Sequence, residues 1–247
     1  MRGRAIPLSP IRKLVVDLTL FHAPTVPVQR VMHLGPVVAA RAALNDRPAW
    51  AALFAKAFAL VAQEIPDLRR AYVKFPWPHL YEYPKSTLSM VFERDWHGEM
   101  VILTTRLGSP EAMPLKSLSD TIKTTKDKPI EDNVDFRRMF AMAKWPLPLR
   151  RLIWWLGLNI GRQRGNYFGT FGITVYSGLG AESLHPLSPL TATINYGVIA
   201  DDGTVAVRIM YDHRVLDGSM VARTLVRMEE KLTGEVLAEL KAMAARP

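Results

Sequence analysis

A histidine followed four residues later by an aspartate and then by a glycine is the part of this sequence best suited to chemistry. His213, Asp217 and Gly218 follow a run rich in β-branched residues and precede a stretch with helical periodicity. Histidine titrates near neutral pH and can take a proton from a weak nucleophile, while a nearby acid can fix local geometry and glycine permits a tight turn. The spacing also fits an ordinary strand-to-helix corner with a solvated histidine, so the spacing alone leaves both interpretations open.

The rest of the sequence offers little other chemistry. The 247 residues include no cysteine, which excludes a disulfide scaffold, a Cys-based zinc site, an iron–sulfur cluster and a Cys nucleophile. The other five histidines show no ligand spacing with carboxylates, so we expect no metal site. The sequence shows neither a Gly-rich phosphate loop nor a dinucleotide fingerprint after a strand.

Helical periodicities and β-rich runs alternate along the chain and place His213 at the end of a strand. The patterns predict helices over residues 8–20, Pro36–Asn45, a stretch that starts near Trp50 and stops at Pro66, Pro114–Lys126 and Ser219–Ala244. They predict strands at Val28–Leu34, Thr87–Glu93, Met100–Arg106, Tyr167–Tyr176, Thr191–Ile199 and Thr204–Tyr211, the last two joined by a hairpin turn at Asp201–Gly203. This mixture of helices and strands predicts an α+β or mixed-sheet sandwich.

The composition is that of an ordinary globular protein, with 49% hydrophobic and 22% charged residues, and the length fits one large domain or two small ones. No segment reaches the roughly 18–20 uninterrupted apolar residues that a membrane-spanning helix needs. Prolines and charges interrupt the apolar stretch near the N-terminus, which therefore lacks the core of a signal peptide. We expect a cytoplasmic protein, peripheral to the inner face of the membrane if it binds lipid.

Most of the net charge of +9 lies in one segment. Between Val134 and Gly165 there are seven basic residues and one acidic residue, a balance of +6, together with three of the six tryptophans. Clustered arginines beside a short apolar run with tryptophans predict a segment lying on an anionic bilayer surface, or a helix packed on another subunit. The candidates for membrane contact are Arg150, Arg151, Trp154 and Trp155. We expect no nucleic-acid partner, because no recognition module accompanies the charge.

The stretch Tyr211–Gly218 resembles the active-site signature of the chloramphenicol acetyltransferase-like superfamily, and most closely that of the catalytic core of the dihydrolipoyl acyltransferases of 2-oxoacid dehydrogenase complexes. The likeness extends over most of the chain. Other segments similar to this family are Leu8–Lys13, Thr25–Pro27, Ala55–Leu60, Ile65–Pro66 and Gly169–Thr174. The resemblance implies an α+β, chloramphenicol acetyltransferase-like two-layer sandwich with a mixed sheet. Residues 1–247 would form one acyltransferase catalytic domain, with 134–165 as a basic, Trp-rich insertion.

The resemblance implies an enzyme that moves an acyl group from a CoA-type thioester to a thiol, hydroxyl or amine. His213 would be the general base, and Thr174 would donate a hydrogen bond to the tetrahedral oxyanion where the family has a serine. Asp217 would hold the site loop through an ion pair with an arginine, for which Arg12 is the candidate, and Gly218 would permit the turn. Coenzyme A, as the acyl-CoA substrate, would be the only cofactor, with no metal.

The resemblance also implies a homo-oligomer. A chain of this length supplies one lobe of a tunnel that longer members build from two, so we expect a trimer, or a multiple of trimers, with His213 facing the next copy. The sequence shows no lipoyl domain, so we expect a stand-alone enzyme, and the basic segment adds the hypothesis of a lipid-like substrate at a membrane surface. The alternatives are a non-catalytic assembly protein with the same fold and a lipoyl-dependent core served by a lipoyl domain on another chain.

Overall fold

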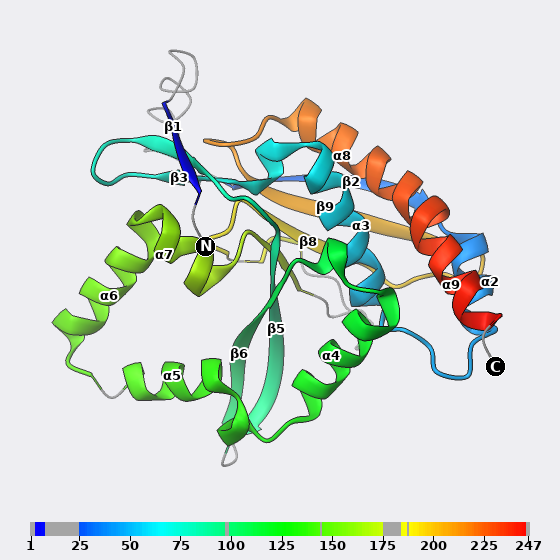
Figure 1. The fold of residues 1–247 in the computed structure, drawn as a ribbon, viewed down its shortest axis with the longest axis horizontal. Helices are drawn as coiled ribbons and strands as arrows, with labels where there is room; N and C mark the ends of the chain where they lie inside the picture. The colour runs from blue at the N-terminus through cyan, green and yellow to red at the C-terminus, as the bar shows by residue number, and fades with distance from the viewer. Residues whose placement is uncertain are drawn as a thin grey trace.

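The computed structural model describes residues 3–7, 25–96, 99–143, 145–174, 184–186 and 188–245. These residues form a six-stranded sheet, a three-stranded sheet and a set of helices (Figure 1). The helix predicted over residues 8–20, and Arg12 within it, lie outside the described residues.

The helices are α2 (Gly35–Ala42), α3 (Trp50–Glu64), α4 (Leu115–Asp127), α5 (Val134–Ala143), α6 (Leu147–Asn159), α7 (Gly161–Phe168), α8 (Gly218–Lys231) and α9 (Leu237–Ala244). The strands are β1 (Arg4–Pro7), β2 (Thr25–His33), β3 (Arg70–Val73), β4 (His79–Glu82), β5 (Thr87–Trp96), β6 (Glu99–Gly108), β7 (Phe171–Ile173), β8 (Ala192–Tyr196) and β9 (Thr204–Asp212). A π-helical segment at Leu232–Val236 joins α8 and α9 into one continuous helix.

The large sheet has the strand order β2-β9-β8-β7-β5-β6, and the small sheet has the order β1-β4-β3. Strand β7 pairs in parallel with both β5 and β8, and the other neighbours in the large sheet are antiparallel. The fold is therefore α+β with a mixed sheet, as predicted. Across its centre, Phe171 on β7 lies opposite Ala192 on β8, which in turn lies opposite Tyr211 on β9.

Helix α3 anchors the helical layer on the central strands through aromatic contacts. The ring of Phe54 stacks on Tyr196 with centroids 4.3 Å apart, and the ring of Phe58 lies 4.6 Å from that of Phe171. Helix α8 packs against both α3 and β2. Burial of these rings and of the apolar faces of α3 and α8 fixes β7, β8 and β9, the strands that carry the candidate site.

The hairpin predicted around Asp201–Gly203 is confirmed, as are the helices and strands predicted elsewhere in the described residues, with shifts of a few residues at their ends. The strand predicted over Tyr167–Tyr176 is wrong at its start. Helix α7 continues through Phe168 and ends at Gly169, whose φ of 84° breaks the helix, and β7 begins only at Phe171. The prediction missed the small sheet, and it gave no bounds for α5, α6 and α7, offering a helix in this basic segment only as one alternative.

Candidate active site

His213 lies at the corner between β9 and α8. The main chain closes this corner, because the N–H groups of Val215 and Leu216 donate to the carbonyl of Asp212 at 2.9 Å and 3.1 Å. The His213 side chain is 37% exposed, while its Nδ1 atom is shielded from solvent. Because Nδ1 is shielded, Nε2 is the ring nitrogen left for proton transfer with a substrate.

Asp217 and Gly218 lie at the same corner, where α8 begins, and the Asp217 side chain is 52% exposed. The Asp217 carboxylate is 3.8 Å from His213 Nδ1. Burial raises the pKa of the neighbouring Tyr211 hydroxyl, and the negative charge of Asp217 raises it further. Gly218 begins α8, and a Cβ there would lie 3.2 Å from the Tyr211 hydroxyl oxygen, so the glycine leaves room for that hydroxyl. Arg12, the predicted partner of Asp217, lies outside the described residues.

Thr174 follows β7 and is held in place by β8. Its main-chain N–H donates to the carbonyl of Ile194 at 3.1 Å, and its own carbonyl accepts from the Asn195 side-chain amide at 2.8 Å. The residue is only 6% exposed. Its position in the sheet is therefore fixed by main-chain and side-chain contacts to a single neighbouring strand.

The sheet register separates Thr174 from His213 within one chain. Phe171 and Tyr211 lie at the same level of the sheet. From that level Thr174 is three residues in one direction, and His213 is two residues in the other. At about 3.3 Å per residue the two side chains are on the order of 15 Å apart along the strands, before the two strand spacings between β7 and β9 are added. One copy of the chain does not bring its own hydroxyl and imidazole together.

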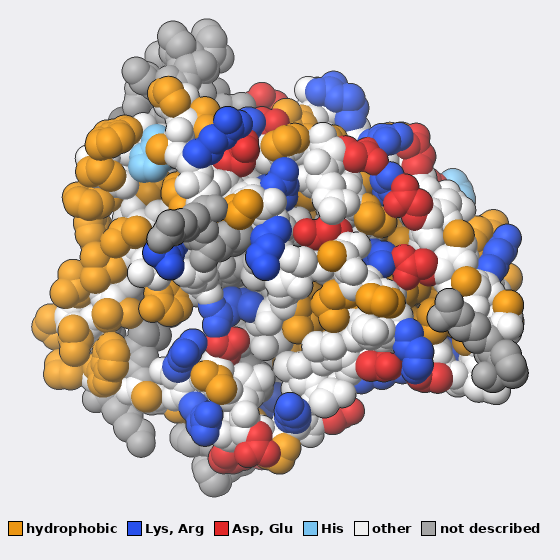
Figure 2. Space-filling model, in the orientation of Figure 1, with side chains coloured by type: hydrophobic (Ala, Val, Ile, Leu, Met, Phe, Trp, Pro, Cys, Tyr) orange, Lys and Arg blue, Asp and Glu red, His pale blue; other side chains and the backbone are white. Residues whose placement is uncertain are grey.

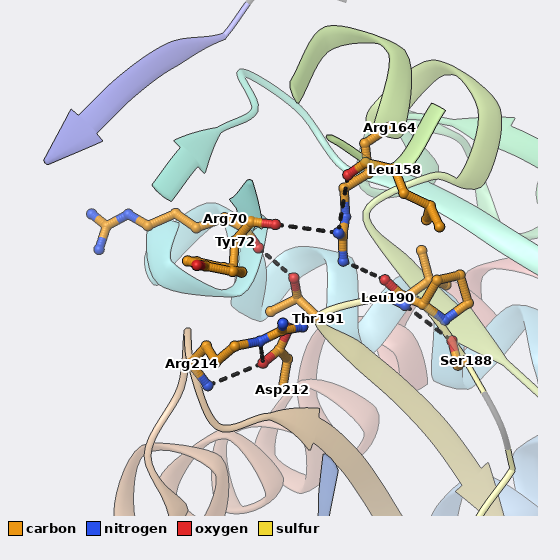
Figure 3. A network of polar contacts seen from close by, with 10 residues as sticks. Arg70, Tyr72, Leu158, Arg164, Ser188, Leu190, Thr191, Asp212 and Arg214 are labelled. Carbon is orange, nitrogen blue, oxygen red and sulfur yellow. Dashed lines mark hydrogen bonds and ion pairs between the residues drawn. The ribbon is translucent and has the colours of Figure 1, made fainter. Parts of the chain in front are cut away.

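The two residues that flank His213 form an ion pair that the sequence analysis missed (Figure 3). Arg214 donates from Nε and Nη2 to the two carboxylate oxygens of Asp212, at 2.8 Å and 2.7 Å, and its main-chain N–H donates to the same carboxylate at 3.0 Å. Asp212 is 2% exposed. Burial alone would lower the pKa of Arg214, but the hydrogen bonds and charge of Asp212 outweigh it and raise that pKa. Opposite charges on either side of the histidine were the available signal in the sequence.

A second arginine, Arg164 of α7, connects the basic segment to the region around the Asp212–Arg214 ion pair. It is 7% exposed, and its guanidinium donates to the main-chain carbonyls of Tyr72, at 3.2 Å, and Pro189 (Figure 3). The Arg214 guanidinium lies over the Tyr72 ring, 4.7 Å from its centroid. Burial lowers the pKa of Arg164, and the nearby Asp212 carboxylate acts in the opposite direction. The segment 134–165 therefore does not hold all of its charge at the surface.

The predicted membrane-contact residues lie on α6. Trp154 and Trp155 are 47% and 46% exposed, and Arg151 is also exposed. The side chain of Arg150 lies outside the described residues. No helix in the described part of the chain has the length and apolar content needed to cross a bilayer. The described residues also contain no group of three acidic or histidine side chains placed to hold a metal ion.

Solved structures share this fold over almost the whole chain. The dihydrolipoamide acetyltransferase of Azotobacter vinelandii, whose structure addresses the catalytic role of a serine, a histidine and an asparagine, superposes with a TM-score of 0.63, at 16% identity over 95% of this chain and 94% of that one. The cubic core of the pyruvate dehydrogenase multienzyme complex gives 0.60, at 16% identity with the same coverage. A chloramphenicol acetyltransferase gives 0.61, at 13% identity over 94% of this chain and 98% of that one.

The chain has the chloramphenicol acetyltransferase-like fold. No protein-family model matches the sequence, and no curated protein matches it either. The three solved structures named above are each less than 25% identical to this chain, so the likeness concerns the fold, and the chemistry has to be argued from the site.

Proposed function

We propose that this chain is an acyltransferase that moves an acyl group from a CoA thioester to a thiol, hydroxyl or amine, with His213 as the general base. The observation that carries the proposal is the place of His213, with an exposed ring edge and an acid behind Nδ1, at the end of a central strand of this fold. The histidine and asparagine of the Azotobacter vinelandii enzyme are four residues apart, as His213 and Asp217 are here. This shared spacing supports the assignment.

In the proposed reaction, His213 Nε2 takes the proton of the acceptor as the acceptor atom attacks the thioester carbonyl carbon. The carbonyl oxygen becomes a tetrahedral oxyanion, which the Thr174 hydroxyl stabilises by donating a hydrogen bond. Collapse of this intermediate breaks the carbon–sulfur bond, and the coenzyme A sulfur leaves with the proton held by His213. Asp217 lies on the Nδ1 side of the ring, with its carboxylate 3.8 Å from that nitrogen.

The separation of Thr174 from His213 supports an assembly in which neighbouring copies share each site. A ring of identical chains repeats one heterologous contact, so every His213 can meet the Thr174 of the next copy. The use of this fold as the core of a multienzyme complex supports a homo-oligomer, and we propose a homotrimer.

Thiol release from a panel of acyl-CoA compounds tests the function. His213→Ala should lower the rate by about 10²–10⁴-fold, the range of a lost general base. The matched control is His33→Ala, which removes an exposed histidine at the far end of β2 and should leave the rate unchanged. Equal rates for the native protein and His213→Ala, or no release from any acyl-CoA, would overturn the proposal. Supplying free dihydrolipoamide as one acceptor separates a lipoyl-dependent core from the other acceptor classes.

Mixing two inactive variants tests whether the site is shared. Thr174→Ala should lower the rate by about 10²–10³-fold, as for a lost oxyanion donor. When His213→Ala and Thr174→Ala chains are co-expressed, about a quarter of the sites in randomly mixed rings pair an intact His213 with an intact Thr174. Activity should therefore return to roughly that fraction, whereas a mixture as inactive as its components means that each chain holds its own complete site.

A further inference from the structure

An exposed apolar surface forms where two elements far apart in the sequence meet. It comprises Phe75 and Trp77 from the loop between β3 and β4, and Leu149, Leu152, Trp154 and Trp155 from α6, each between 43% and 60% exposed. The rings of Phe75 and Trp155 are in edge-to-face contact, with centroids 5.6 Å apart, so the two elements form one surface. We call these six residues the apolar face. Figure 2 shows hydrophobic side chains along this edge of the molecule, over α6, α7 and the β3–β4 hairpin.

The shape of the apolar face suits contact with a lipid bilayer better than insertion into a groove of another protein. Helix α6 packs against α7 through Gly157 and through Trp154, whose ring centroid lies 5.4 Å from that of Phe168. Most of its other described positions are exposed, so the helix forms a ridge at the edge of the molecule (Figure 1). Its 13 residues span about 20 Å, too little to cross a hydrocarbon core but enough to lie in the interface. Half of the six tryptophans belong to this face, and tryptophan favours the boundary between lipid and water.

The charge around the apolar face points to an anionic partner. No aspartate or glutamate occurs between Phe136 and Ala181, a run of 46 residues that contains seven basic residues. Lys74, Arg151 and Arg162 beside the face are exposed. The acids nearest the adjoining hairpin are already paired, since Arg70 forms ion pairs with Glu82 on β4 and with Asp67, just before β3. A two-fold contact between copies would place these cations against their equivalents, whereas a bilayer with anionic headgroups attracts all of them.

We propose that the apolar face docks on an anionic lipid bilayer and that the acyl donor or acceptor is a lipid-like molecule held in that bilayer. The second part rests on the proposed acyltransferase function, and the first does not. The chain from Tyr72 on β3 to Phe75 in the loop after it joins the two sites, because the Arg214 guanidinium lies over the Tyr72 ring and Phe75 belongs to the apolar face. Three residues span at most about 10 Å, so docking would bring the Arg214 side of the His213 corner close to the lipid surface.

Flotation with vesicles tests the docking. The native protein should float with vesicles of phosphatidylcholine and phosphatidylglycerol in equal parts and remain behind with phosphatidylcholine alone. Phe75→Ser/Trp77→Ser should bind at least about tenfold more weakly, because two exposed aromatic side chains no longer enter the interface. The matched control is Val31→Ser/Val226→Ser, which removes exposed apolar side chains from β2 and α8 and should leave binding unchanged.

The charge contribution has its own pair of variants. Arg151→Gln/Arg162→Gln should weaken binding by about fivefold for each charge removed, and Arg47→Gln/Arg223→Gln, on exposed arginines elsewhere, should not. Equal flotation with both vesicle types, or no flotation, would overturn the assignment. The assignment would also be overturned if the native protein did not bind vesicles and Phe75→Ser/Trp77→Ser changed its oligomeric state, because the apolar face would then only join copies of the chain.

Activity separates failure of the docking from failure of the function. Thiol release with a water-soluble acyl-CoA and acceptor should be the same in Phe75→Ser/Trp77→Ser as in the native protein, while release from a long-chain substrate dissolved in anionic vesicles should fall with binding. His213→Ala should float normally and release thiol about 10²–10⁴-fold more slowly than the native protein. A native protein that floats but is inactive on all substrates disproves the acyltransferase and leaves the docking intact. If Phe75→Ser/Trp77→Ser and the native protein release thiol at equal rates from the vesicle substrate, the proposal of a lipid-like substrate is wrong.

Discussion

Removing Arg214 should destabilise the protein more than removing both Arg214 and the charge of its partner Asp212. Arg214→Met leaves the Asp212 carboxylate, which is 2% exposed, without the two side-chain hydrogen bonds that it accepts at 2.7 Å and 2.8 Å. Breaking a buried ion pair in this way costs about 3–5 kcal/mol. The charge of nearby Arg164 and the partial exposure of the Arg214 side chain reduce this penalty, so we expect a loss of about 3 kcal/mol in the free energy of unfolding.

Asp212→Asn keeps an acceptor for the main-chain N–H of residue 214 and removes the buried charge. It should cost about 1–2 kcal/mol, the value of a weakened charged hydrogen bond. Asp212→Asn/Arg214→Met removes both charges of the pair, with their two side-chain hydrogen bonds and the contact with the Tyr72 ring, so it should cost about 2 kcal/mol. The double variant is therefore expected to be about 1 kcal/mol more stable than Arg214→Met alone, whereas independent effects would add to about 4–5 kcal/mol.

Urea unfolding followed by far-UV circular dichroism, at one protein concentration, measures all three variants. The matched control is Arg227→Met, which breaks an exposed pair with Glu64 and should cost less than about 1 kcal/mol. A double variant as unstable as the sum of its components would refute the claim that an unpaired carboxylate causes the loss. Thiol release from acyl-CoA in the same variants should fall in the order of their instability, since this pair brackets His213.

Two further changes test the turn and the surface charges. Gly203→Ala should cost about 3 kcal/mol or more in urea unfolding, because residue 203 has a φ of 83° and a Cβ would lie 2.3 Å from the Gly35 nitrogen. Gly234→Ala, where nothing lies near the added carbon, should be neutral or stabilising, and equal losses in both would contradict this account. Hydrogen bonds from Lys116 and Lys123 lower the pKa of Asp46 from 3.8 to about 2, so this carboxylate stabilises the fold above about pH 4 and ceases to do so as the pH falls toward 2. The small difference in urea midpoint between the native protein and Asp46→Asn should therefore shrink below about pH 4 and with added salt, and a difference independent of pH would contradict the assignment.

The main elements were predictable because their signals are local. The apolar periodicity of α3 and the turn residues at Asp201–Gly203 each determine one element without help from the rest of the chain. Strand β3, with four residues, carries no such signal and depends on its pairing with β4. Helices α5, α6 and α7 could not be given bounds because arginines, tryptophans and prolines obscure the helical period. Gly161 and Gly165 in α7 are buried by packing and do not break the helix.

The candidate site was predictable only where its residues are close in sequence. His213, Asp217 and Gly218 lie at one corner, and their order along the chain already implies it. The ion pair of Asp212 with Arg214 is also local, but its importance comes from the burial of Asp212 and from the contact of Arg214 with Tyr72, which is distant in sequence. Arg164 shows the limit most clearly, since a cation in the most basic segment of the chain is buried against main-chain carbonyls. Which arginine of a cluster turns inward depends on acceptors that tertiary structure supplies.

The position of Thr174 connects the sheet register to the need for a second copy. Strand β8 lies between β7 and β9, parallel to β7 and antiparallel to β9. The C-terminal ends of β7 and β9 therefore point in opposite directions along the strands. Thr174 follows the end of β7 and His213 follows the end of β9, so no side-chain rotation within one chain can join them. A change that favours the monomer over the assembly therefore leaves the proposed site incomplete. The proposed activity should depend on protein concentration wherever the copies dissociate. The same topology that makes the fold stable thus makes assembly a condition of the proposed chemistry.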